Sequence, residues 1–145
     1  MNSKFRGIIA VLAGIVVSVA VVLIMEAISV SLFPPPRELQ VASPEVMKEY
    51  IARLPAGAFA LVIAGSSLGT LAGGTVAALM ARERPYFFAG IVGAANFVVS
   101  VLNMLSFPHP VWFMVTVLVL IPVCALAGAF AASLVQGKSK ALVAN

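Results

Sequence analysis

The chain has few of the residues that usually carry chemistry. It holds one cysteine and one histidine in 145 residues, and charged residues make up only 10% of it. A single cysteine forms neither an internal disulfide nor a paired-cysteine metal site, so we interpret Cys124 as a small buried apolar residue. A lone histidine does not make a metal site either. We therefore expect no bound metal and no cofactor.

The motifs of several large enzyme classes are missing as well. The sequence has no glycine-rich phosphate loop followed by lysine, no HExxH helix, no Ser-His-Asp arrangement and no C-terminal lipidation box. Ionisable residues are also scarce in its apolar stretches, which disfavours a membrane enzyme. The net charge of +4 comes from basic residues at the ends of apolar segments, where membrane topology places them. We expect neither an enzyme nor a nucleic-acid partner.

Apolar residues, by contrast, make up 62% of the chain, and the mean hydropathy is +1.12. A soluble domain of this size cannot bury so much apolar surface. A helix of about 20 residues crosses the hydrocarbon of a bilayer. The sequence predicts an all-α integral membrane protein, in which residues 1–145 form a single transmembrane domain, a four-helix bundle in the lipid bilayer. The predicted spans are about 7–33, 56–81, 86–107 and 111–135.

The first span begins after Lys4 and Arg6, as a signal peptide would, but its apolar core is longer than the usual 7–15 residues, and we interpret it as a retained helix. Lysine and arginine predict the orientation. The N-terminus, the turn at 82–85 and the tail after Gln136 hold two basic residues each. The long loop at 34–55 holds three beside three glutamates, and the loop at 106–110 holds none. This bias predicts that both termini are cytoplasmic, in a cell membrane of the prokaryotic plasma-membrane type.

Residues 34–55 form the one long polar connection, and we expect a short amphipathic helix in this outer loop. Ser43 suits the N-cap and Pro44 the first helical position. An ordered loop without a helix is the alternative. The helix would lie on the outer membrane surface or cap the bundle. Its apolar face would hold Val46, Met47, Tyr50, Ile51 and Leu54.

The second span carries small residues at every fourth position. Gly65, Gly69, Gly73 and Ala77 share one helical face, which predicts close packing against another helix. The partner is either a helix of the same chain or a second copy. Within one chain, Gly128 in the fourth span belongs to a matching row.

A second group of residues is polar and lies within or beside the spans. Glu26 is the one acidic residue inside a span, and His109 precedes the fourth span on the same outer side. Two interpretations stay open. These residues form a polar site, in which Glu26 titrates and binds a proton or cation, or they are structural groups that hydrogen-bond neighbouring helices. The group also includes Asn96, Ser100 and Asn103, which share one helical face of the third span.

Four short spans with a glutamate in the first resemble the plan of the small multidrug-resistance transporters in this one respect. The chain departs from that plan in its long first loop and in Trp112, its one tryptophan, which lies at a span end. We therefore expect a structural or accessory membrane protein that acts through helix packing or assembly, as a homo-oligomer or within a larger membrane complex. The alternative is a small proton- or cation-coupled transporter or channel with Glu26 as the titrating group.

Overall fold

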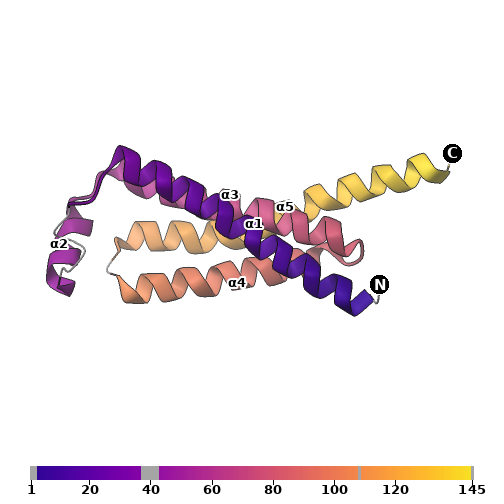
Figure 1. The fold of residues 1–145 in the computed structure, drawn as a ribbon, viewed down its shortest axis with the longest axis horizontal. Helices are drawn as coiled ribbons and strands as arrows, with labels where there is room; N and C mark the ends of the chain where they lie inside the picture. Colours follow the sequence, from indigo (N-terminus) through magenta and orange to yellow (C-terminus); the bar gives the residue numbers. More distant parts are fainter. Residues whose placement is uncertain (1–2, 37–42, 108, 145) are drawn as a thin grey trace.

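Helix is the one kind of regular secondary structure among the described residues. A computed structural model describes residues 3–36, 43–107 and 109–144. Four helices in it are long and apolar enough to cross a membrane, which confirms the prediction of an all-helical chain with four apolar spans (Figure 1). The helices are α1 (Ser3–Leu32), α2 (Pro44–Arg53), α3 (Ala56–Ala81), α4 (Pro85–Ser106) and α5 (Val111–Ala144).

Proline and left-handed residues set most of the helix boundaries. Three consecutive prolines follow Phe33 after the end of α1. They stop the helix, because proline lacks the N–H that continues it. Pro55 and Pro110 directly precede α3 and α5, and proline also disfavours helical conformation in the residue before it. The turn from α3 to α4 is only three residues long. Its Arg82 and Arg84 both adopt positive φ, at 63° and 49°.

Helix α5 extends beyond the predicted fourth span. The sequence predicts the end of that span near residue 135, where hydropathy falls, and α5 continues to Ala144. No proline follows Pro122, so nothing breaks the helix when it leaves the apolar region. Figure 1 shows the C-terminal part of α5, in yellow, extending beyond the other helices.

Helix α3 is the centre of the bundle. It packs against α1, α4 and α5, and α4 also contacts α5 and, less extensively, α1. The N-terminus and the 82–84 turn lie at one end of the bundle, which we call the terminal end (Figure 1). There the Arg6 guanidinium lies 3.6 Å from the Glu83 carboxylate. The opposite end carries α2, and we call it the α2 end.

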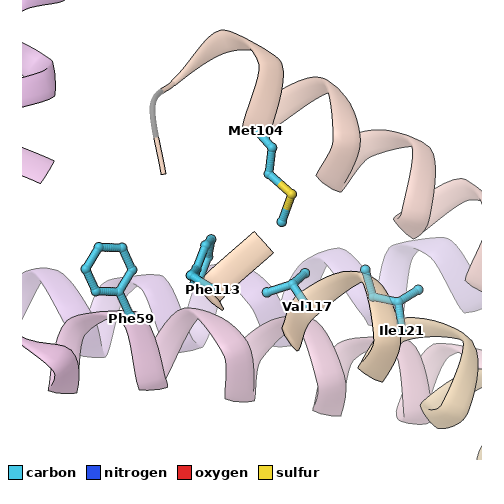
Figure 2. Close-up of a cluster of buried hydrophobic side chains, with 5 residues drawn as sticks. All are labelled: Phe59, Met104, Phe113, Val117 and Ile121. Atoms are coloured by element: carbon cyan, nitrogen blue, oxygen red, sulfur yellow. The ribbon is translucent and has the colours of Figure 1, made fainter. Parts of the chain in front are cut away.

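The core changes character along the bundle. Near the α2 end it is built of large side chains from α3, α4 and α5, which converge in Figure 2: Phe59, Met104, Phe113, Val117 and Ile121. Near the terminal end it is built of alanines: Ala78, Ala89, Ala129 and Ala132. Small side chains let the helix backbones approach closely there.

Helix α2 occupies the loop where the sequence predicted a short helix. Its Ile51 packs against the large-side-chain core, as does Leu54 directly after it. The exposed face carries the ion pair between Glu49 and Arg53. The helix therefore covers the end of the bundle, which was one of the two positions considered for it.

Candidate functional site

The small residues of α3 lie directly against α1 of the same chain. A Cβ atom on Gly69 would be 2.8 Å from the Ser18 carbonyl oxygen, and a Cβ on Gly65 would be 2.9 Å from the Met25 Cβ. A Cβ on Gly73 would overlap the carbonyl oxygen of Gly14. Each of these contacts leaves no room for a side chain. The predicted packing face is therefore used within one chain, and its partner is α1.

The face continues at Ala77, which is fully buried. A Cβ built on Gly14 would lie 2.9 Å from the Ala77 Cβ. Gly128 of α5, the matching residue suggested by the sequence, packs elsewhere. A Cβ there would be 2.7 Å from the Leu71 carbonyl oxygen and 3.0 Å from the Thr75 hydroxyl oxygen. Leu71 and Thr75 belong to a different face of α3. Two faces of this helix are thus in close contact, one with α1 and one with α5.

Three polar side chains from three helices meet beside the α1–α3 contact. The Asn96 side-chain amide of α4 donates one hydrogen bond to the Ser18 hydroxyl, at 2.7 Å, and another to the Thr70 hydroxyl, at 3.0 Å. Thr70 in turn donates to the Ser66 carbonyl oxygen at 2.7 Å. Ser18 is 1% exposed and Thr70 is fully buried. We call Ser18, Thr70 and Asn96 the polar node.

The polar node lies close to the middle of each helix that contributes to it. In a bilayer this is the depth at which an unsatisfied polar group is most costly. Both amide hydrogens of Asn96 are used, and none of the three side chains titrates near neutral pH. The node can therefore hold three helices together, but it supplies no acid, base or ion ligand of its own.

Sequence reasoning placed Asn96 on a polar face of its helix but missed both of its partners, Ser18 and Thr70. The α1 signal is the four-residue spacing of Gly14 and Ser18, which places a hydroxyl on the same face as a glycine contact. Thr70 follows Gly69 directly and gives no periodic signal of its own.

Glu26 does not belong to the node. It follows Ser18 by eight residues, so it lies about 12 Å further along α1 and is rotated by about 80° around the helix. Its side chain is exposed on the isolated chain. Among the described residues, no hydrogen bond or ion pair reaches its carboxyl group. The structure therefore separates Glu26 from the polar interior of the bundle.

The remaining candidate residues are also dispersed. Ser100 is half-buried and Asn103 is exposed, although both share the helical face of Asn96. The His109 ring lies in the connection before α5, where Nδ1 is 2.7 Å from the Phe107 carbonyl oxygen and the ring stacks on Phe113 at 5.1 Å. No hydrogen bond among the described residues joins any of these three side chains to Glu26.

A cavity of about 210 Å³ lies at the α2 end, away from the polar node. It is lined by the residues on either side of the long loop: Phe33, Pro34, Tyr50, Arg53, Leu54 and Pro55.

The described residues contain no group of three histidine, cysteine or acidic side chains that could hold a metal ion. Comparisons with protein-family models, curated proteins and solved structures find no match to this chain.

Proposed function

We propose that this chain is a structural or accessory component of a cell membrane, and that it acts by packing and assembling helices. The observation that carries this proposal is that the polar side chains inside the bundle hydrogen-bond neighbouring helices. The Asn96 amide hydrogen-bonds both Ser18 and Thr70, and none of these three node side chains titrates near neutral pH. The one acidic residue within a span, Glu26, faces outward, where another protein would meet it.

The shape of the bundle supports the same role. The close helix contacts at Gly14, Gly69 and Gly73 join backbones without intervening side chains. Such contacts favour a fixed packing over one that opens and closes, because any separation loses many van der Waals contacts at once. The outer face of α1 stays free for a partner, since α1 packs against α3 and α4 on its other side.

The second candidate is a small proton- or cation-coupled transporter or channel with Glu26 as the titrating group. The observation in its favour is a carboxyl group at a depth where such residues tend to serve transport. Assembly of several copies would then have to build the pathway outside the single bundle, because Glu26 is remote from the polar node.

Reconstitution into liposomes tests both candidates. We expect vesicles with the wild-type chain, loaded with a pH-sensitive dye or a cation indicator, to leak no faster than protein-free vesicles under an imposed potential. We expect the same of Glu26→Gln. A flux above the protein-free level that disappears in Glu26→Gln would overturn the assembly proposal and establish the second candidate.

Photo-crosslinking in native membranes tests assembly directly. A benzophenone amino acid at Leu23, which is 57% exposed on α1, should give a discrete protein adduct. The matched control is Val98, which is 55% exposed on α4 and should react with lipid. Equal labelling patterns at the two positions would contradict a specific protein partner for α1.

We also propose that the terminal end faces the cytoplasm. The charge bias supports this orientation, and the end carries Arg6, Arg82, Arg84 and Lys138. In a Cys124→Ala background, a Lys138→Cys chain should resist a membrane-impermeant maleimide in intact cells and react after lysis. Labelling of intact cells would reverse the orientation.

A further inference from the structure

The outer face of α1 carries an exposed row of side chains at a regular spacing. Its members follow one another at intervals of four, three, four, three and four residues, and every one is exposed. The row lies about 120° around the helix from Ser18, and so away from the contact with α3. We call it the α1 stripe: Leu12, Val16, Val19, Leu23, Glu26 and Val30.

Glu26 makes this stripe different from an ordinary lipid-facing surface. It lies six residues before Leu32, about 9 Å from the end of α1. Its neighbour Met25 packs against Gly65, which is about 13 Å inside α3. The carboxyl group therefore lies within the apolar length of both helices and not at their ends. Exposure to lipid there is strongly unfavourable, so residues of this kind usually face protein or water.

The spacing of the stripe points to a second copy of the same helix. Alternation of three and four residues is the seam of a left-handed helix pair, in which equivalent positions of two parallel helices meet. A two-fold axis along the bilayer normal brings each residue to its own counterpart at the same depth. Glu26 would then face Glu26 of the other copy without any adjustment of height.

The chemistry of the carboxyl group agrees with this partner. The chain has no lysine or arginine from Gly7 to Leu32, in α3 or α4, or in α5 before Lys138, so these helices of a second copy offer Glu26 no lysine or arginine partner. A protonated carboxyl group is both donor and acceptor and therefore complements another carboxyl group.

We propose that the α1 stripe is the interface of a parallel homodimer, in which the Glu26 carboxyl groups of the two copies hydrogen-bond each other. This inference rests on the assembly function proposed above, and it names a second copy of the chain as the partner. The glycine face of α3 is already occupied by α1, so the dimer adds a contact to a separate, exposed side of α1 and leaves the bundle unchanged.

Cysteine cross-linking in lipid tests the geometry with a matched pair. In a Cys124→Ala background, Leu23→Cys lies in the stripe, and Ile24→Cys lies one residue on, rotated by about 100°. The two positions are 57% and 60% exposed. With copper phenanthroline as the oxidant, we expect Leu23→Cys to form a disulfide-linked dimer several-fold faster than Ile24→Cys. Equal rates, or no dimer from Leu23→Cys, would overturn the proposal.

Variants of Glu26 test the chemistry, with the dimer fraction measured by single-molecule photobleaching in supported bilayers. Glu26→Gln should retain the dimer, because paired amides also complement each other. Glu26→Ala should lower the association constant about tenfold, as expected for the loss of hydrogen bonding across a membrane helix pair. The control is Ile28→Ala, which is exposed outside the stripe and should have no effect. Dimers that persist unchanged in Glu26→Ala would refute the carboxyl contact.

The results separate this inference from the proposed function. A wild-type chain that is monomeric in bilayers would overturn the homodimer, while a different partner for α1 would keep the assembly function. A dimer that conducts ions only when Glu26 is present would retain the interface and overturn the structural role.

Discussion

The close approach of α1 and α3 makes a quantitative prediction for Gly73→Ala. The added Cβ would overlap the Gly14 carbonyl oxygen and lie 2.9 Å from the Ser18 Cβ. Both obstacles belong to α1 and neither is a flexible side chain, so the helices must move apart. Overpacking of this kind costs about 1–3 kcal/mol. Alanine is the better helix former by up to about 1 kcal/mol, which offsets part of that cost. We expect a net loss of about 1–2 kcal/mol in the free energy of unfolding.

Trp112 is the one tryptophan and its ring makes an edge contact with Phe59 at 5.5 Å, so its fluorescence reports the packing of α5 on α3. Unfolding in mixed micelles of increasing dodecyl sulfate content would be followed by this signal. The control is Gly90→Ala, whose Cβ meets nothing within 4 Å and which should be neutral or slightly stabilising. If both variants unfold at the same detergent fraction as the wild type, backbone contact does not hold α1 to α3.

Three further predictions follow from the node, the loop helix and the turn. Asn96→Leu should lower the free energy of unfolding by about 1–2 kcal/mol, since two hydroxyls lose their donor, whereas Asn103→Leu at an exposed position should not change it. The backbone N–H of Glu45, and after it the Ser43 hydroxyl, hold the pKa of Glu45 below its ordinary 4.5. A lowered pKa means that the stabilisation of α2 is present above pH 4.5 and is lost as the pH falls through the folded value. Ser43→Ala should therefore move the NMR titration midpoint of Glu45 upward, and an unchanged midpoint would exclude the hydroxyl. Arg82→Gly should raise stability by about 1 kcal/mol because it relieves a positive φ, and a loss of stability would show that the arginine side chain is needed in the turn.

The polar residues show where sequence reasoning was sufficient and where it was not. The amide of Asn96 was expected to face other helices, because hydrocarbon offers it no hydrogen-bond partner. Its partners, Ser18 and Thr70, depend on how α1 and α3 cross beside α4. Asn103 lies on the same face of α4 and is nevertheless exposed. Periodicity gives the shared face of a helix but does not give the length over which a neighbour covers it.

The loop helix gives a second example. Its position followed from Ser43, Pro44 and the apolar spacing, all of which are local signals. The sequence could not decide between the membrane surface and the end of the bundle. That choice depended on contacts of Ile51 and Leu54 with a core that α3, α4 and α5 build together.

By itself, the sequence determined that the chain has four helices long and apolar enough to cross a membrane. A segment that enters hydrocarbon must satisfy every backbone N–H and C=O within its own helix. The spacing of Gly65, Gly69 and Gly73 also identified the face of α3 that carries small residues. Only the tertiary structure decided that α1 covers this face, and that Glu26 consequently lies outside the bundle. The physical reason is that helix formation is local, whereas the choice of neighbour depends on contacts between residues far apart in the chain, which no periodicity records.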